Sequence, residues 1–230
     1  MPLNRDEILK ATQGLRVADV VDALDWIGQR DVGHVDPAVR PLWSGTHMVG
    51  LAITTRYIPV TDPMPTMTEE EYDRFTSNWY GKICPYPILD QVRPGDVIVV
   101  DASGTRVGLW GSSNTLSAIN KGARGIVTDG GCRDTYEVAL QKCPVFSRHI
   151  ARTMVQGRLK LASMGEPVLV GGVWISPGDL VVGDDDGVVA VSQANMERVI
   201  ARARKVLDAD KRDRRKLYEQ GGRKPDETVQ

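Results

Sequence analysis

The chain has 230 residues, of which 41% are hydrophobic and 26% charged, a composition typical of a folded globular protein rather than a disordered one. Its formal net charge of -1 provides no overall attraction to nucleic acid or to an anionic membrane. It contains no apolar run of about 18 residues and no apolar signal core near its start, so we expect a cytoplasmic protein.

The first part of the chain predicts a helix, a strand and a long irregular segment. Residues 17–28 place apolar side chains at helical spacing, and residues 48–58 are rich in β-branched side chains, as strands are. Between 59 and 87, prolines and aromatic residues surround a short acidic helix that begins after Thr68. A segment of this length is typical of a lid or an interface, although a plain surface excursion is the alternative.

The middle of the chain alternates strands and helices in the order β-β-α-β-α-β. The expected strands are 93–102, 106–110, 124–129 and 144–149, and the expected helices are 112–123, capped by a serine or asparagine, and 133–143. This order indicates a mixed α/β domain with crossover helices.

Residues 166–192 predict three short strands joined by P-G-D and D-D-D-G turns, an antiparallel β unit. The D-D-D-G turn lacks the ligand spacing of a calcium loop. A long helix over 193–220 follows, with a basic run that aspartates interrupt, as on a solvated helix face. We therefore expect one α/β domain over 1–192, a helical extension over 193–220 and a mobile tail over 221–230.

Two loops, W-G-S-S-N and T-D-G-G-C-R-D, each follow a predicted strand and precede a predicted helix. If those strands are parallel neighbours, both loops open at the edge of the sheet where α/β proteins bind ligands. In the first loop, Gly111 permits a close backbone turn, and the amides of Ser112, Ser113 and Asn114 form a helix N-terminus that suits a carboxylate or phosphate. The alternative is that these polar residues only cap the helix.

The second loop places a guanidinium beside a carboxylate. Arg133 offers a planar fork for a carboxylate, and Asp134 is a hard oxygen ligand of the kind that holds Mg²⁺ together with water. A capping or salt-bridge role for this pair is the alternative. Cys132 lies in the same loop, but no histidine is near it in sequence, so a catalytic thiol is disfavoured. Cys84, Cys132 and Cys143 are odd in number and scattered, which argues against a disulfide framework or a zinc site.

The stretch G-S-S-N-T-L-S-A-I-N-K-G-A-R-G-I-V-T-D-G-G-C-R-D resembles the signature of one known family. That family contains the RraA regulator of ribonuclease E and the class II aldolases of 4-hydroxy-4-methyl-2-oxoglutarate and 4-carboxy-4-hydroxy-2-oxoadipate. The matching positions are Gly111, Ala118, Gly122, Gly125, Val127, Asp129, Gly130, Arg133 and Asp134. Further similar motifs extend the resemblance over most of residues 15–220.

The resemblance implies an RraA-like β/β/α swivelling-type domain and a homotrimer or homohexamer with sites between subunits. It implies that Asp134 binds Mg²⁺ or Mn²⁺, partly through water, and that Arg133 holds the substrate. The amides of Ser113 and Asn114 would receive the carboxylate of pyruvate, so that Gly111, Ser112, Ser113, Asn114 and Arg133 form the substrate site.

The function that follows is a divalent-metal-dependent carbon–carbon lyase that releases pyruvate from a small 4-hydroxy-2-oxo acid. Oxaloacetate decarboxylation yields the same enolate and is an expected side activity. A Schiff-base route through Lys121 or Lys142 is disfavoured because neither lysine lies in the two loops. The alternatives are a non-catalytic regulator that binds a ribonuclease, and an enzyme of the same scaffold with a different small-acid reaction. We expect no nucleic-acid or membrane partner.

The chain departs from the aldolase pattern in three places. Ser112 stands where aldolases of this family carry an acidic residue, so either Asp101, another acidic residue or a neighbouring subunit replaces it, or the reaction differs. The family's C-terminal helix contributes a glutamate across the interface, where this chain offers Asp208 or Asp210. The insertion at 59–87 suggests a substrate unlike the best-known ones.

Overall fold

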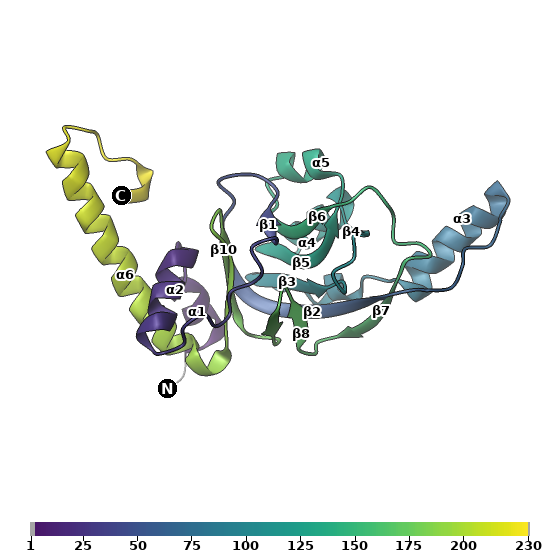
Figure 1. Ribbon diagram of the computed structural model, residues 1–230, viewed down its shortest axis with the longest axis horizontal. Coiled ribbons are helices and arrows are strands. Elements are labelled where there is room, and N and C mark those ends of the chain that lie inside the picture. The colour runs from purple at the N-terminus through teal and green to yellow at the C-terminus, as the bar shows by residue number, and fades with distance from the viewer. Residues whose placement is uncertain (1–2, 230) are drawn as a thin grey trace.

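The structure, a computed structural model, describes residues 3–229 and has a central body with one projecting helix at each end (Figure 1). The helices are α1 (Arg5–Ala11), α2 (Val17–Trp26), α3 (Glu69–Asn78), α4 (Ser112–Asn120), α5 (Thr135–Leu140) and α6 (Gln193–Gln220). The strands are β1 (Arg40–Pro41), β2 (Met48–Pro59), β3 (Asp96–Asp101), β4 (Gly108–Trp110), β5 (Gly125–Cys132), β6 (Val145–Ile150), β7 (Leu159–Met164), β8 (Val168–Val170), β9 (Val173–Ile175), β10 (Leu180–Asp184) and β11 (Gly187–Val191).

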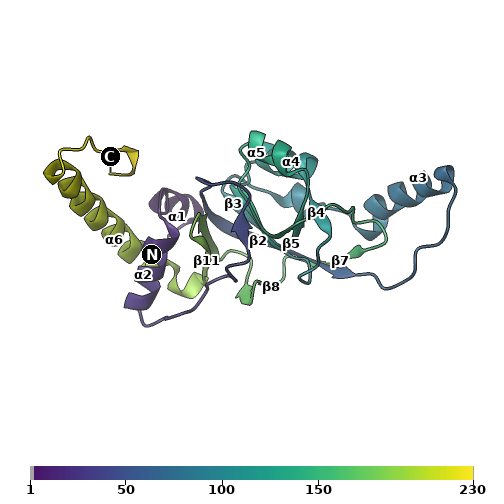
Figure 2. The same ribbon diagram turned by 45° about the horizontal axis from the view of Figure 1, so that its top comes forward.

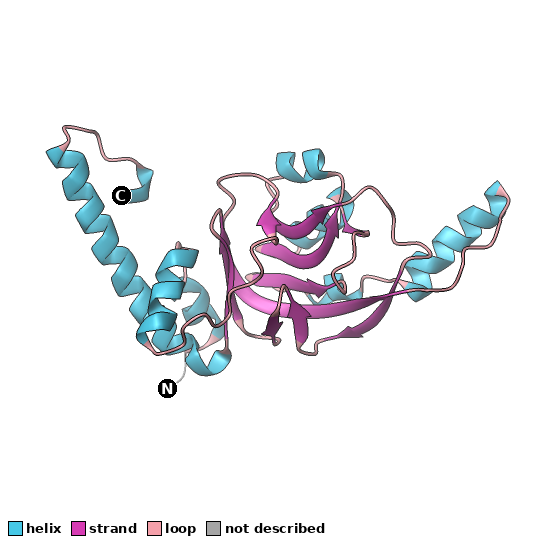
Figure 3. Ribbon diagram, viewed as in Figure 1, coloured by secondary structure: helices cyan, strands magenta, loops and turns pink. Residues whose placement is uncertain are grey.

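Within the described residues, nine strands form one sheet, which occupies the centre of the molecule (Figure 3). Its order is β1-β6-β5-β3-β2-β10-β11, with β4 paired to β5 and β7 paired to β2. Strands β2, β3, β5 and β6 run parallel, and β4 runs parallel to β5. Parallel neighbours need crossover connections: α3 and the turns after it lie between β2 and β3, α4 between β4 and β5, and α5 between β5 and β6. The predicted succession of strands and helices in the middle of the chain is therefore confirmed.

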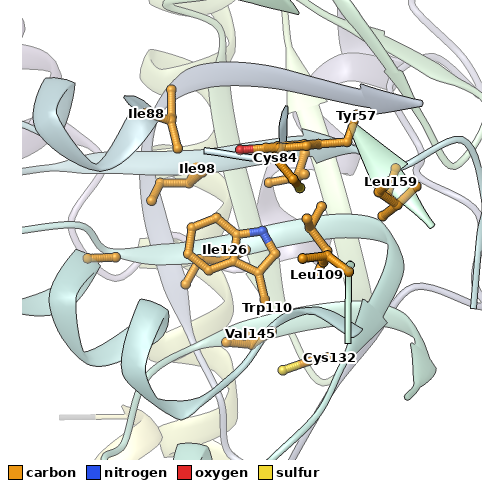
Figure 4. Packing of buried hydrophobic residues seen from close by; sticks show 14 of the residues in the cluster. Tyr57, Cys84, Ile88, Ile98, Leu109, Trp110, Ile126, Cys132, Val145 and Leu159 are labelled. Carbon is orange, nitrogen blue, oxygen red and sulfur yellow. The ribbon is translucent and has the colours of Figure 1, made fainter. Parts of the chain in front are cut away.

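Side chains that alternate along β3 enter two different apolar clusters, because successive residues of a strand point to opposite faces. Ile98 and Val100 join the cluster beneath α4 and α5, whereas Val97 and Val99 join the cluster that β8 and β9 cover. Figure 4 shows Ile98 close to the ring of Trp110 in the first cluster. Burial on both faces explains why the strand reads as a continuous apolar run.

The molecule has three layers: the β8–β9 hairpin, the main sheet, and the helices α4 and α5 on the other face (Figure 2). This is the β/β/α arrangement that the family resemblance implies, and the predicted fold class is confirmed.

The expectation of three strands over 166–192 is wrong, because this region forms four. Gly171 and Gly172, with φ of 53° and 80°, form a two-residue turn that separates β8 from β9. Such a turn requires positive φ at both positions, which glycine adopts readily. The apolar residues on either side of it read as one strand in the sequence. Strands β10 and β11 then form a hairpin that joins the main sheet beside β2.

The predicted long C-terminal helix is confirmed as α6. Its first half packs on α2 through apolar side chains that end at Leu207, and its second half has no buried residue and projects from the body (Figure 1). After the helix the chain turns back, so that Arg214 bonds Thr228 and Arg215 bonds the carbonyl of Val229. Mobility of 221–230 stays a prediction, and Gln230 lies outside the described residues. Neither α6 nor any other helix of residues 3–229 is long and apolar enough to cross a membrane.

The segment 59–87 contains the acidic helix that the sequence predicts. Thr68 and Glu71 form a capping box at the start of α3, which bears no buried residue and projects from the body. The root of this projection is different: a π-helical turn, Trp79–Ile83, and a 3-10 helix, Pro87–Gln91, return the chain to the core.

A register shift in β5 redirects its pairing between Thr128 and Gly131. At the shift, the buried Asp129 accepts hydrogen bonds from the backbone N–H groups of Ala102 (2.7 Å) and Gly104 (2.8 Å). These bonds fix the turn that carries the chain from β3 toward β4. Burial raises the pKa of the Asp129 carboxyl above its ordinary value, although the two N–H donors oppose that effect.

The Asp129 carboxyl makes the stability of the protein depend on pH. Above the ordinary pKa of aspartate, about 3.9, the unfolded chain loses this proton while the folded chain retains it up to the raised pKa. The free energy of unfolding therefore falls as pH rises through this window. We expect Asp129→Asn to make that slope less negative in urea titrations at a series of pH values. The exposed Asp62→Asn is the control, and identical slopes in all three proteins would contradict the assignment.

Candidate functional site

The two loops singled out in the sequence lie side by side because β4 and β5 are parallel neighbours. The backbone N–H of Arg133 donates to the carbonyl of Trp110 over 2.9 Å and ties the end of one strand to the end of the other. The expectation that both loops open at one edge of the sheet is confirmed.

The first loop delivers an open helix N-terminus. The N-cap of α4 is Gly111, in extended backbone, and no side chain caps the helix. The expected serine or asparagine cap is therefore wrong: Ser112 is already the first helical residue. Thr115, one turn in, donates its hydroxyl to the Gly111 carbonyl (2.8 Å). Glycine offers no side-chain acceptor, so the first amides of α4 are left without the usual capping bond and can receive an anion.

The second loop places Asp134 directly against that turn. Asp134 is the N-cap of α5 and adopts the left-handed conformation, with φ 54° and ψ 36°. A Cβ atom on Gly111 would lie 2.6 Å from Asp134 Oδ2, so no residue with a side chain fits at 111 without moving the carboxylate. Aspartate tolerates this backbone conformation better than most residues do, but the strain remains, and strain of this kind concentrates at functional sites.

Arg133 and Asp134 form an ion pair with 3.5 Å between Nε and Oδ2. Their side chains are 33% and 35% exposed, so both retain access to solvent and to a ligand. The stem of Arg133 passes over Gly108, where a Cβ atom would lie 3.1 Å from its Cδ. The pair is too long and too exposed to contribute much stability, which is typical of surface ion pairs.

A pocket of about 250 Å³ joins these groups. Its lining consists of Tyr80, Tyr86, Gly108, Leu109, Trp110, Gly111, Ser113, Asn114, Arg133 and Asp134. The structure thus brings together all the predicted substrate and metal residues except Ser112, which is not among the lining residues. Tyr80 and Tyr86 come from the root of the insertion and were not predicted, because nothing in the irregular sequence of 59–87 relates them to the two loops.

The alternative nucleophiles lie in unsuitable places. Cys132 is fully buried, and burial raises the pKa of its thiol to about 12, so it stays protonated. Lys121 follows the far end of α4 and pairs with Asp90 at 2.9 Å. Lys142 follows the end of α5. The Schiff-base and catalytic-thiol alternatives therefore receive no support.

Asp101 was considered as a replacement for the acidic residue missing at 112, and Asp208 or Asp210 for the glutamate of the family's C-terminal helix. All three lie away from the pocket. Asp101 pairs with Arg56 at 3.1 Å and accepts a hydrogen bond from the backbone N–H of Ser103.

Asp210 pairs with Arg16 and Arg214 on the side of the molecule formed by α2 and α6, and Asp208 lines a shallow hollow on α6. None of them lines the Asp134 pocket of the same chain, so a role across a subunit interface stays a prediction.

A larger hollow, of about 670 Å³, lies between α2 and α6. Its charges balance within the groove, with Asp22, Asp25 and Asp210 facing Arg30, Arg202 and Lys205. Arg202 also covers the ring of Trp26, 5.0 Å from the ring centre. Size alone does not identify a site, and this groove lacks the convergence of backbone amides, guanidinium and carboxylate found at Asp134.

The donor set fits a hydrated divalent ion. No cluster of three or more histidine, cysteine, aspartate or glutamate side chains occurs in residues 3–229, which disfavours a closed structural metal site. Asp134 presents one carboxylate at the pocket wall. Magnesium is commonly bound through one or two carboxylates, with water and substrate completing its shell.

The fold and the pocket define a mixed α/β protein with a polar site at the carboxyl ends of parallel strands. A family model described as RraA-like, Aldolase/RraA, matches residues 17–190, and the chain belongs to this family.

Two solved structures share the fold over nearly the whole chain. An uncharacterized protein from Pseudomonas syringae is 29% identical, with a TM-score of 0.75, and the match covers 97% of this chain and 96% of that one. RraAS2 from Streptomyces coelicolor, described as an unusual member of the RNase ES inhibitor RraA protein family, is 28% identical, with a TM-score of 0.74 and coverage of 94% and 100%.

Among curated relatives, the 4-hydroxy-4-methyl-2-oxoglutarate aldolase of Thermus thermophilus is 30% identical over 108 residues, which are 46% of this chain and 65% of that protein. The chain spans 27%, 57% and 55% of the lengths of three other curated relatives that it matches.

The backbone of Asp134 leads to a prediction about stability. Asparagine tolerates the left-handed region as aspartate does, whereas alanine does not. We expect Asp134→Ala to be less stable than Asp134→Asn by about 1 kcal/mol, measured by urea denaturation. Equal stability of the two variants would mean that the loop relaxes out of this conformation. For activity measurements, Asp134→Asn is accordingly the better variant.

Proposed function

We propose that this chain is a divalent-metal-dependent carbon–carbon lyase that releases pyruvate from a small 4-hydroxy-2-oxo acid. The observation that carries the proposal is the convergence of the open N-terminus of α4 with Arg133 and Asp134 in one pocket. The aldolase name of the Thermus thermophilus relative supports the same reaction class.

The substrate carboxylate would occupy the N-terminus of α4. The amides of Ser113 and Asn114 and the positive end of the helix dipole favour an anion there. Arg133 faces the same pocket and can donate two parallel hydrogen bonds to a planar oxygen pair. This arrangement fixes the 2-oxo acid end of the substrate.

Asp134 would hold the divalent ion, and a bound ion supplies a Lewis acid that polarises the 2-oxo group. In the cleavage, the C4 hydroxyl gives up its proton, the C3–C4 bond breaks, and its electrons form the enolate of pyruvate, which gains a proton at C3. Arg133 would place positive charge beside the developing enolate, and a charge already held in position stabilises the enolate with little reorganisation.

The acceptor for the C4 hydroxyl proton distinguishes this chain from the aldolase pattern. Asp134 is the only carboxylate among the described residues that line the pocket, and Ser112 cannot accept a proton as a carboxylate does. The acceptor would therefore be water or a group from a neighbouring subunit of a trimer or hexamer. Decarboxylation of oxaloacetate yields the same enolate without a hydroxyl proton acceptor, so it should be less sensitive to the absence of an acidic residue at 112.

The decisive experiment measures pyruvate release by the purified protein with Mg²⁺ or Mn²⁺, from a panel of 4-hydroxy-2-oxo acids and from oxaloacetate. Release that a chelator abolishes and added metal restores supports the proposal. Metal binding without pyruvate from any substrate favours a different small-acid reaction on this scaffold. Neither metal binding nor turnover favours a non-catalytic role of the kind that the Streptomyces coelicolor protein's description names.

Asp134→Asn removes the charge but keeps the shape and backbone preference of the residue. We expect it to reduce pyruvate release by at least about 100-fold, because the loss of metal-based charge stabilisation amounts to several kcal/mol. Titration with Mn²⁺ followed by electron paramagnetic resonance should show weakened binding in the same variant. Asp90→Asn, which alters an exposed aspartate paired with Lys121, is the matched control. Full activity of Asp134→Asn at limiting metal would exclude the metal assignment.

Arg133→Lys keeps the positive charge but loses the planar fork. We expect kcat/KM to fall by about 10-fold to 100-fold, with an increase in KM, because a lysine cannot form the two parallel bonds to the substrate. The exposed Arg124→Lys is the control. A value of kcat/KM near that of the unaltered protein would show that Arg133 only serves the local ion pair.

A further inference from the structure

The root of the 59–87 insertion is anchored in the main core. Trp79 is only 7% exposed, and its indole N–H donates to the carbonyl of Leu159 over 2.9 Å. Cys84 is fully buried, and its backbone N–H reaches the carbonyl of Trp79 over 2.7 Å, five residues back. Figure 4 shows Cys84 beside Tyr57 in the core. The root is therefore a fixed part of the body, and α3 projects beyond it, with Phe75 near its end packed against Trp79 (5.0 Å between ring centres) and the core.

The π-helical turn between these anchors determines where Tyr80 lies. A turn of this type inserts an extra residue into a helix, is rare, and occurs often at functional sites. Trp79 enters the core, while the next residue, Tyr80, lines the Asp134 pocket and is 38% exposed. One residue of the turn thus serves the core and its neighbour serves the pocket.

Tyr86 lines the same pocket beside Tyr80 and lies closer to the core. Its hydroxyl donates to the carbonyl of Leu109 (2.7 Å), and its ring stands edge-on to Trp110 with 5.9 Å between centres. The ring of Tyr80 lies 6.4 Å from that of Tyr86. Burial raises the pKa of Tyr86 well above its ordinary value, so its phenol stays neutral. We call Tyr80 and Tyr86 the aromatic wall of the pocket.

The charged side chains of the pocket lie at the side opposite the aromatic wall. Among the described residues that line it, only Arg133 and Asp134 are charged. With the substrate's first carboxylate at α4 and Arg133, the described lining residues of this chain offer no further cation to a second carboxylate. A second carboxylate against the aromatic wall would give up part of its hydration for at most the phenol hydroxyl of Tyr80, with no cation to pair with it, and that transfer is unfavourable.

We propose that the aromatic wall binds an uncharged aromatic or apolar group at the C4 end of the substrate. The preferred substrates are then aryl or alkyl 4-hydroxy-2-oxo acids, whose cleavage gives pyruvate and a neutral aldehyde, rather than dicarboxylic ones. Flat rings pack well against tyrosine faces and edges. This assignment rests on the proposed function for the orientation of the substrate, since the carboxylate end must occupy α4.

The test uses binding as well as turnover. Two analogues that lack the C4 hydroxyl, and so cannot be cleaved by this route, serve as ligands: 2-oxo-4-phenylbutanoate and 2-oxoglutarate. Isothermal titration with the full chain and Mg²⁺ measures each affinity. We expect the phenyl analogue to bind at least about 10-fold more tightly, and Tyr80→Ala to remove most of that difference, since one aromatic contact contributes on this scale. Tyr80→Phe should retain it.

Tyr72→Ala is the matched control. Tyr72 is 39% exposed, nearly the same as Tyr80, but it lies on α3 and does not line the pocket. We expect it to leave the ratio of the two affinities unchanged. Tyr80→Arg adds a cation at the wall and should shift the preference toward 2-oxoglutarate.

The outcomes separate this inference from the proposed function. Suppose that the phenyl analogue binds more tightly, that this depends on Tyr80, and that no substrate yields pyruvate. That result supports the aromatic wall as the binding surface and excludes the proposed lyase activity. Suppose instead that the protein releases pyruvate, prefers dicarboxylic substrates, and keeps that preference in Tyr80→Ala. That result supports the proposed lyase activity and contradicts the role of the aromatic wall. A phenyl preference that Tyr80→Ala and Tyr72→Ala leave equally intact also overturns it, because the selectivity would then come from elsewhere.

Discussion

The site depends on the parallel pairing of β4 with β5, which places the Asp134 carboxylate directly beside Gly111. Two chain segments approach there so closely that a single methyl group would come within 2.6 Å of Oδ2. The approach is possible because β4 and β5 run parallel and the N–H of Arg133 bonds the carbonyl of Trp110. Backbone pairing therefore brings the open end of α4, a guanidinium and a carboxylate into one pocket before any side-chain interaction is considered.

Most of this arrangement could be predicted from the sequence because local signals determine it. The apolar runs of β3 and β5 and the loops that follow β4 and β5 define a parallel sheet edge, and Gly111, Arg133 and Asp134 stand at fixed offsets from the strand ends. Gly171 and Gly172 are a recognised hairpin signal, but they were missed because the strands on either side have only three residues each and read together as one. The serine cap was wrong because the N-cap lies one residue earlier, at a glycine.

The aromatic wall could not be predicted, for a different physical reason. Tyr80 and Tyr86 reach the pocket only because Trp79 and Cys84 fix a π-helical turn against the core, and that turn has no sequence period of its own. The relation between the insertion and the two loops is set by tertiary packing over a long sequence separation. Similarly, the sequence offered Asp101 as a replacement for the acidic residue missing at 112, but in the fold its carboxylate pairs with Arg56, away from the pocket.

The π-helical turn also affects how the specificity of this pocket can change over time. Trp79 and Cys84 cannot vary without disturbing the apolar cluster that lies beneath α4 and α5, whereas Tyr80 is partly exposed and is not among the residues of that cluster. Substitutions that alter the pocket wall are thus tolerated at one position and eliminated at its immediate neighbour. Under the proposal made above, a single replacement at residue 80 would change the group accepted at one end of the substrate, while Arg133 and Asp134 at the other end of the pocket stay the same.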